Sequence, residues 1–239
     1  MIRVLINGYT GRMGIITKKA LLKENGFELV KCTNSQHDLR AEIIRHQPDV
    51  VIDFSLASLG YKNTKIILEC GSRPVIGTSG FTQAQVDELL VLSKEKALGG
   101  LIAPNFSLGA VLMMIYSAKI AKYFPNVEIV EAHSIQKEDS PSGTAIRTAE
   151  LISSVIHDVG SKQTKIKLSQ DVNVHGIKIH SIRMDGFIAK QSVLFGSKGE
   201  VLKLTHSTSD RESFMAGVIL SCKEVLKRKQ LYYGLENFL

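Results

Sequence analysis

The sequence has no tryptophan and only three cysteines in 239 residues. Cys32, Cys70 and Cys222 are far apart and form no CxxC pair. A disulfide framework and a cysteine-bound metal are therefore not expected, and a reducing cytoplasm suits the chain. The opening residues MIRVLINGYTG enter a strand at once, which leaves no room for a signal peptide. We therefore expect a cytoplasmic protein without a metal site.

Long hydrophobic runs are also missing. The most apolar stretch, residues 108–121, is too short to cross a bilayer and already contains Lys119. The net charge is +7, yet no basic-aromatic stripe of the kind that binds single-stranded nucleic acid is present. The basic residues are scattered, apart from Lys223, Lys227, Arg228 and Lys229. We expect neither a membrane nor a nucleic-acid partner, and the charge suits anionic small ligands.

The first half alternates short apolar runs with helical segments. Strands are predicted over residues 2–8, 27–33, 49–55, 73–81 and 101–107, and helices over residues 12–25, 38–46, 58–70 and 82–97. This alternation predicts an α/β fold with a Rossmann-like, doubly wound parallel sheet. A last helix over residues 211–228 is expected to return and pack on this half. We therefore predict a dinucleotide-binding domain formed by residues 1–107 and 212–239.

A glycine-rich turn, GYTGRMG, follows the first predicted strand. Gly8, Gly11 and Gly14 fall where a dinucleotide pyrophosphate would approach the backbone at the positive end of a helix. The spacing is GxxGxxG and not the commoner GxGxxG, so packing glycines in a tight turn are the alternative. The strand before the turn and the helix after it favour a nucleotide site.

Three further strand ends carry small or hydroxyl-bearing residues that suit a nicotinamide or ribose. They are Asp53-Phe54-Ser55, Gly77-Thr78-Ser79-Gly80 and Ala103-Pro104-Asn105-Phe106. The second strand lacks the acidic residue that often holds the adenine ribose of NAD. Asn34 stands there instead. An asparagine can bond a ribose without repelling a 2′-phosphate, so NADPH and NADH both remain possible cofactors.

The second half has alternating strands, predicted over residues 127–133, 165–170, 176–184, 186–197 and 200–208. Helices are expected over residues 107–124 and 143–158, and Asp185-Gly186 and Lys198-Gly199 are typical of hairpin turns. We predict an α+β domain over residues 108–211 with an open mixed, mostly antiparallel sheet. Apolar alternation on both faces, as in Val193, Phe195, Leu202 and Leu204, favours oligomerisation through this half. We expect it to be the substrate-binding and oligomerisation domain.

The stretch EAHSIQKEDSPSGTA, residues 131–145, brings several chemically active side chains together. Ser142 is a plausible helix cap, and the N–H groups of Gly143 and Thr144 would form a carboxylate-sized anion site. Lys137 adds a charge or a proton, and His133 titrates near neutral pH. Each feature alone is compatible with a purely structural role. Their combination after a nucleotide-binding domain favours function.

Motifs spread from residue 8 to about residue 217 resemble those of the dihydrodipicolinate reductase (4-hydroxy-tetrahydrodipicolinate reductase) family. They are GYTGRMG, DFS, GTSGF, APNFSLGA, a loosened EAHxxxKxDxPSGTA, and HSIR. The resemblance implies NADPH- or NADH-dependent reduction of a cyclic dicarboxylate on the diaminopimelate route to lysine. It also implies a homotetramer.

The resemblance further implies the roles of individual residues. His133 would donate and accept a proton, and Lys137 would be the second proton donor. Gly143 and Thr144 would bind a substrate carboxylate, and Ser134 stands where the family usually has a second histidine. Residues on the cofactor would be Gly8, Tyr9, Thr10, Gly11, Arg12, Met13, Gly77, Thr78, Ser79, Ala103, Pro104, Asn105 and Phe106.

Two other hypotheses remain open. A second kind of two-domain nicotinamide dehydrogenase would act on an amino-acid-derived aldehyde. If it formed an acyl-enzyme it would need a nucleophilic cysteine, and none of the three lies near the anion site in the sequence. A non-catalytic dinucleotide sensor would explain the glycine turn and the charge, but gives no reason to keep His133, Lys137 and the SGT turn together.

Overall fold

The structure is a computed structural model that describes residues 1–156 and 172–239. The chain divides into two compact units, Met1–Leu108 with Arg211–Leu239, and Gly109–Asp210. The chain passes from one unit to the other twice, so both of its ends belong to the first unit.

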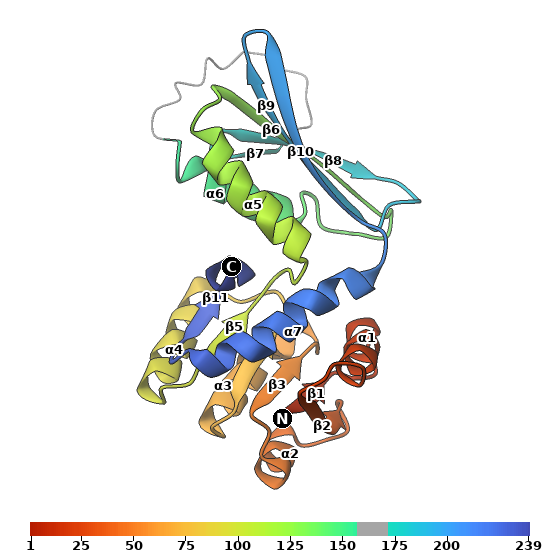
Figure 1. Ribbon diagram of the computed structural model, residues 1–239, viewed down its shortest axis with the longest axis vertical. Helices are drawn as coiled ribbons and strands as arrows, with labels where there is room; N and C mark the ends of the chain where they lie inside the picture. The colour runs from red at the N-terminus through yellow and green to blue at the C-terminus, as the bar shows by residue number, and fades with distance from the viewer. Residues whose placement is uncertain (157–171) are drawn as a thin grey trace. The chain divides into compact units, whose positions relative to one another are not determined.

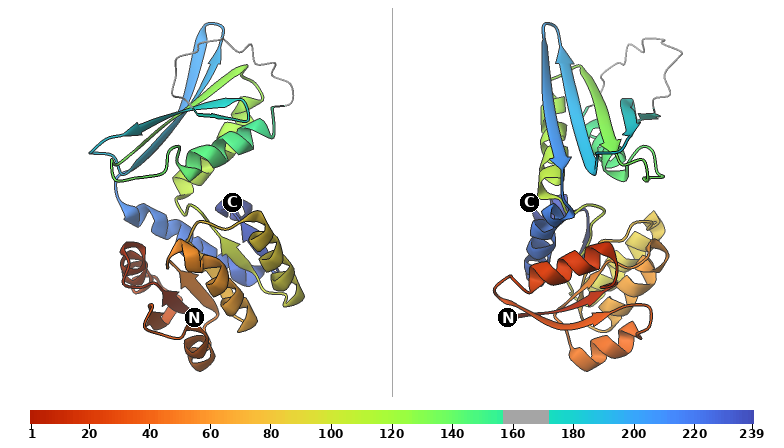
Figure 2. Two further views of the ribbon diagram at one scale, coloured as in Figure 1. Left: turned by 180° about the vertical axis from the view of Figure 1, so that it is seen from behind. Right: turned by 90° about the vertical axis from the view of Figure 1, so that its right-hand side faces the viewer.

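The first unit is built on six parallel strands in the order β11-β5-β4-β3-β1-β2. Helices α1 and α7 contact each other, whereas α2, α3 and α4 contact one another in succession. These two groups cover opposite faces of the sheet (Figures 1 and 2), which confirms the Rossmann-like doubly wound prediction. The strands are β1 (Ile2–Asn7), β2 (Phe27–Thr33), β3 (Val50–Asp53), β4 (Arg73–Ile76), β5 (Gly100–Ile102) and β11 (Leu231–Tyr233). The helices are α1 (Arg12–Leu21), α2 (Leu39–His46), α3 (Gly60–Glu69), α4 (Gln83–Glu95) and α7 (Met215–Glu224), with 3-10 turns η1 (Ala57–Leu59), η2 (Arg211–Phe214), η3 (Val225–Lys227) and η4 (Leu235–Phe238).

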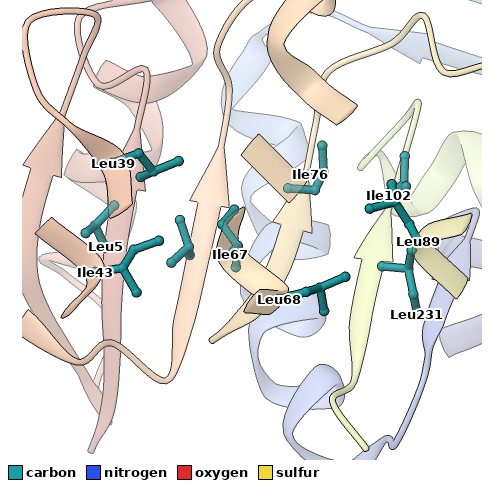
Figure 3. Packing of buried hydrophobic residues seen from close by; sticks show 10 residues of the cluster. Leu5, Leu39, Ile43, Ile67, Leu68, Ile76, Leu89, Ile102 and Leu231 are labelled. Carbon is teal, nitrogen blue, oxygen red and sulfur yellow. The ribbon is translucent and has the colours of Figure 1, made fainter. Parts of the chain in front are cut away.

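Aliphatic side chains fill the space between the sheet and helices α2 to α4 (Figure 3). The central strands read as continuous apolar runs because both of their faces are covered. All four residues of β3, for example, are buried. The core on this face consists of Leu5, Leu39, Ile43, Val51, Ile67, Leu68, Ile76, Leu89, Ile102 and Leu231.

The strand order reverses between β1 and its neighbours. The chain moves from β1 to β2 on one side, then returns to place β3 on the other side of β1. In open sheets of this kind, ligands bind beyond the carboxyl ends of the strands at such a reversal. The sheet therefore places a ligand site next to the residues that follow β1 and β3.

The C-terminal segment differs from the prediction. The single helix predicted over residues 211–228 is divided into η2, α7 and η3. Strand β11, which was not predicted, then pairs with β5 and forms one edge of the sheet.

The second unit holds a mixed sheet in the order β10-β9-β6-β8-β7. The pair β6–β8 is parallel and the other three pairs are antiparallel, which confirms an open mixed sheet. Helices α5 and α6 lie along one side of it (Figures 1 and 2). The elements are α5 (Leu108–Ala121), β6 (Asn126–His133), α6 (Gly143–Ser153), β7 (Val172–Val174), β8 (Ile177–Arg183), β9 (Ala189–Ser197) and β10 (Glu200–Thr208).

Two expectations about this sheet were wrong. Lys198-Gly199 does join a hairpin, β9–β10, but Asp185-Gly186 does not, because β6 lies between β8 and β9. The four apolar residues that suggested two apolar faces also lie on one face. Val193 pairs with Leu204 and Phe195 with Leu202, and the buried Val193 and Phe195 pack in the core with the helices. The predicted strand over residues 165–170 and the end of the predicted helix over residues 143–158 lie outside the described residues.

Within residues 1–156 and 172–239, the structure has no helix with the length and apolar character that a bilayer span requires.

Candidate active site

The three glycines after β1 differ in what the fold requires of them. Gly8 has a φ of +79°, and a Cβ there would lie 2.7 Å from the carbonyl carbon of Phe54. A Cβ on Gly14 would lie 2.3 Å from the Gly8 oxygen. A Cβ on Gly11 would meet only that oxygen, at 3.4 Å. The fold therefore needs Gly8 and Gly14 but tolerates a side chain at Gly11, where close approach of a ligand is the remaining reason for glycine.

The N-terminus of α1 is suited to an anion. Gly11 precedes the helix, no side chain of the described residues caps it, and the first turn contains no acidic residue. The N–H groups of the first helical turn carry partial positive charge and lack partners inside the helix. A pyrophosphate fits this end of the helix. The other predicted residues of the turn range from half-buried to exposed: Tyr9, Thr10, Arg12 and Met13.

A buried polar network joins the carboxyl ends of the neighbouring strands β3, β1 and β2. Asp53 is fully buried and accepts hydrogen bonds from the side chain of Asn7 (3.1 Å), the N–H of Ser55 (2.9 Å) and the side chain of Asn63 (3.0 Å). Thr33 donates to Asn7 over 2.9 Å. Burial raises the pKa of the Asp53 carboxyl, and the hydrogen bonds from Asn63 and Ser55 offset part of the rise. This network fixes the backbone on which the glycine turn rests.

The residues that follow β4 and β5 lie at the same carboxyl end of the sheet. The N–H of Gly77 donates to the oxygen of Asp53 over 2.9 Å, which continues the ladder from β3. A Cβ on Gly77 would lie 2.1 Å from the ring of Phe54, and that ring meets Phe106 edge to face at 5.8 Å. Thr78 is buried, and its Oγ1 has no hydrogen-bond partner among the described residues. The remaining predicted residues here are the exposed Ser79 and Pro104, the half-buried Asn105 and the buried Ala103.

Asn34 follows β2, beside the glycine turn. The carbonyl oxygen of the preceding residue, Thr33, accepts hydrogen bonds from the N–H groups of both Gly8 and Tyr9. The Asn34 side-chain oxygen accepts from the N–H of Gln36 at 3.1 Å and lies 2.8 Å from Nδ1 of His37. Asn34 therefore organises a local turn at the position where a ribose-binding acid often stands.

In the second unit, His133 is the last residue of β6 and is held by Glu131. Its Nδ1 lies 2.5 Å from Oε2 of Glu131. Glu131 is fully buried and also receives two bonds from Arg183, with Nη1 at 3.0 Å and Nη2 at 2.8 Å. Burial alone would raise the pKa of the Glu131 carboxyl, but the bonds from His133 and Arg183 outweigh it and lower the pKa to about 2. Glu131 is therefore a carboxylate at neutral pH.

Lys137 lies in the loop between β6 and α6. Its Nζ is 2.7 Å from Oδ1 of Asp139, and the Asp139 carbonyl accepts from Arg183 at 2.6 Å. The Ser134 hydroxyl accepts from the N–H of Gln136 at 3.3 Å. Arg183 thus connects the loop that carries Lys137 to the carboxylate that holds His133.

Helix α6 is capped by Ser142, as the sequence predicts. The Ser142 hydroxyl accepts from the N–H of Ala145 at 3.2 Å, and the Ser142 N–H donates to Oε1 of Glu131 at 3.2 Å. A Cβ added to Gly143 would meet nothing within 4 Å. Thr144 follows in the first turn. The structure therefore joins His133 and the start of α6 through one carboxylate.

Two residues of this cluster received no role from the sequence. Glu131 stands two residues before His133 on a strand, and that period-2 spacing already places both side chains on one face. Arg183 is paired in register with His133 across the parallel β6–β8 pair, which no local sequence pattern shows. The described residues contain no group of three His, Cys, Asp or Glu side chains that could hold a metal ion.

A glycine turn at the reversal point of a doubly wound sheet, together with a histidine, lysine and anion-site cluster on a second unit, defines a two-domain nicotinamide-dependent oxidoreductase. The family model described as "Dihydrodipicolinate reductase, N-terminus" matches residues 2–106, and "Dihydrodipicolinate reductase, C-terminus" matches residues 109–239. The chain belongs to the dihydrodipicolinate reductase family.

Individual relatives agree with this assignment. The chain is 45% identical to the 4-hydroxy-tetrahydrodipicolinate reductase of Enterococcus faecalis over 259 residues, covering 100% of each. It is 44% identical to that of Legionella pneumophila strain Lens over 240 residues, covering 99% of each. A solved structure, dipicolinate-bound dihydrodipicolinate reductase from Paenisporosarcina sp. TG-14, matches with a TM-score of 0.89 at 38% identity over 100% of both chains.

More distant structures share the fold alone, such as an amine dehydrogenase from Mycobacterium smegmatis with a TM-score of 0.67 at 10% identity. The family assignment confirms the oxidoreductase class, the reduced nicotinamide dinucleotide cofactor and the place in diaminopimelate and lysine biosynthesis.

Proposed function

We propose that this chain reduces 4-hydroxy-tetrahydrodipicolinate, a cyclic dicarboxylate, with His133 and Lys137 as its catalytic residues. The observation that carries this proposal is the Glu131 carboxylate, which holds His133 at 2.5 Å and the start of α6 at 3.2 Å. An acid–base group and an anion site are thereby held in one cluster, as reduction of a dicarboxylate requires.

In this proposal the first unit is the dinucleotide-binding domain. The pyrophosphate would lie on the N-terminus of α1 against Gly11, whose missing Cβ leaves room for it. Asn34 would bond the adenine ribose, and its neutral side chain accommodates both NADPH and NADH. The nicotinamide side would be lined by Gly77, Thr78, Ser79, Ala103, Pro104, Asn105 and Phe106.

The second unit supplies the substrate site and the proton. One carboxylate of the substrate would be held by the N–H groups of Gly143 and Thr144, with Ser134 as a neutral hydrogen-bonding neighbour. The 4-hydroxyl group of the substrate would first leave as water, which gives a conjugated imine in the ring. When bound, the nicotinamide would supply the hydride that reduces this imine. The electron-rich enamine that results takes a proton from His133 or Lys137, directly or through water. The positive charge of Lys137 favours the hydride transfer because negative charge builds up on the substrate as it is reduced.

We also propose that the second unit mediates assembly into a homotetramer in the cytoplasm. The sheet face away from α5 and α6 carries partly exposed apolar side chains, among them Val201 (70% exposed) and Ile182 (41% exposed). An open face and an uncovered edge strand are suited to a partner subunit. Sedimentation of the full chain tests this proposal, and a monomer at micromolar concentration would contradict it.

Kinetics of three variants tests the catalytic roles. Consumption of NADPH is followed by absorbance with enzymatically generated substrate. Lys137→Ala should lower kcat by about two orders of magnitude or more. Thr144→Val removes a donor to a charged carboxylate and should raise KM, with a loss of about 1.5–3 kcal/mol. Lys198→Ala, in the exposed β9–β10 turn, is the matched control and should behave as the wild type. If Lys137→Ala keeps a near-normal kcat and Thr144→Val is silent, the stretch is only a helix cap.

A further inference from the structure

We propose that Glu131 is a positioning residue, which holds His133 in one tautomer and one orientation and links it rigidly to the substrate-carboxylate site at α6. This inference rests on the proposed role of His133 and deepens it. The supporting observations are the geometry of one strand, its parallel neighbour and one helix start.

The strand geometry comes first. Residues two apart on a strand point to the same face, so Glu131 and His133 are neighbours on the face of β6 that packs against α6. The resulting contact is the 2.5 Å approach of His133 Nδ1 to Glu131 Oε2. A carboxylate can only accept at this contact, so Nδ1 carries the proton. Nε2 is then the ring nitrogen that meets the substrate.

The second observation is that the carboxylate is fixed by other partners. Oε1 accepts from the N–H of Ser142 and from Nη2 of Arg183, and Oε2 accepts from Nη1 of Arg183 as well as from His133. A bidentate guanidinium bond holds both oxygens in one plane. Because Ser142 is also the cap of α6, the same carboxylate sets the position of the helix end relative to the imidazole.

The third observation concerns the charges around the imidazole. On the β8 side His133 is paired with Arg183, and on the β9 side with the uncharged Ala189. The loop that follows contains the ion pair between Lys137 and Asp139. Glu131 is the carboxylate in hydrogen-bond contact with the ring. The imidazole is therefore held through Nδ1 by a carboxylate that is itself fixed by Arg183 and Ser142.

The same strand offers a matched control. Glu128 lies on the opposite face of β6 and also meets a histidine, with Oε2 at 2.9 Å from Nε2 of His180. That pair is solvent-exposed. Glu128→Gln therefore removes a carboxylate from a histidine without touching the catalytic cluster.

The first test is a nitrogen–proton correlation spectrum of the wild-type imidazoles, with His133 assigned through His133→Gln. This measurement requires neither enzymatic activity nor a folded variant of Glu131. We expect neutral His133 to carry its proton on Nδ1. A proton on Nε2 in the wild-type protein would overturn the proposal.

The second test is the pH dependence of kcat in Glu131→Gln. If protonated His133 is the donor, kcat should fall at least tenfold and the alkaline limb of its pH profile should change. KM for NADPH should stay unchanged, and Glu128→Gln should reproduce the wild-type profile. An unshifted limb in a folded Glu131→Gln variant would refute the positioning role.

These outcomes are separable from failure of the proposed function. If the wild-type chain does not oxidise NADPH with this substrate, the catalytic proposal fails. The tautomer of His133 still tests whether Glu131 positions the imidazole. If the wild type is active and the tautomer is the other one, only the role of Glu131 fails.

Discussion

The turn after β1 uses the same residue type for two different purposes. Gly8 and Gly14 are required by the fold, because a Cβ on either would lie within 2.7 Å of backbone atoms. Gly11 has no such conflict, and its N–H donates to the Gly8 oxygen at 3.1 Å. A sequence pattern records all three as glycines of one motif. The structure separates Gly11, where a side chain would fit, from Gly8 and Gly14, where packing leaves no room for one.

Two substitutions in this turn should therefore have opposite effects. Gly11→Val should weaken NADPH binding at least tenfold with the fold intact, because a branched side chain enters the pyrophosphate position. Gly14→Ala should instead destabilise the fold by about 1–3 kcal/mol, since its Cβ has no room beside Gly8. Fluorescence titration with NADPH and urea unfolding measure the two effects. A folded Gly11→Val variant with normal affinity would contradict the pyrophosphate assignment.

At the scale of elements, helix α6 begins with its capping residue, followed by the residue proposed to bind the substrate carboxylate. Ser142 caps the helix through the N–H of Ala145. Gly143 has open space where its Cβ would be, although glycine is a poor choice in a helix.

Substitutions at these two neighbouring positions should separate the two properties. Ser142→Ala should lower the free energy of unfolding by about 1 kcal/mol with a smaller effect on KM. Gly143→Ala should leave stability unchanged or raise it by up to about 1 kcal/mol, and should raise KM for the dicarboxylate. Urea unfolding and steady-state kinetics provide both numbers. Equal KM in Gly143→Ala and the wild type would place the substrate carboxylate elsewhere.

Elements that depend on local pattern could be predicted from the sequence, and elements that depend on distant pairing could not. The periods of 2 and 3.6 gave the doubly wound sheet and the open second sheet. Strand β11 was missed because its three residues gain their place only from β5, more than a hundred residues earlier in the chain. Asp185-Gly186 is a dipeptide typical of hairpin turns, but β6 occupies the position between β8 and β9. The β6–β8 pairing that overrides this local signal is long-range.

The same distinction applies to the candidate site. The sequence indicated His133, Lys137, Gly143 and Thr144 because they fall in one short stretch. Glu131 was within reach of a period-2 argument. Arg183 was not, since its position beside His133 follows from the parallel pairing of strands separated by an entire helix.

At the scale of the whole molecule, the carboxylate that ties β6, β8 and α6 together makes stability depend on pH. The pKa of Glu131 is lowered to about 2 from its ordinary value of 4.5. The folded state therefore holds this group ionised more strongly than the unfolded chain does. Its contribution is fully present above pH 4.5 and is lost as the pH falls through about 2.

This contribution should be visible in the stability of the wild type relative to Glu131→Gln. The shift corresponds to about 3 kcal/mol at neutral pH, of which about 2 kcal/mol should be lost between pH 6 and pH 3. Urea unfolding followed by circular dichroism at both pH values gives the free energies. Because every other carboxylate titrates in both proteins, the difference between them isolates Glu131. Protonation leaves the buried end of Arg183 without its counter-charge, so the wild type should lose its advantage as the pH falls. A difference that stays constant from pH 6 to pH 3 would mean that the three elements are held together by packing and not by this charge.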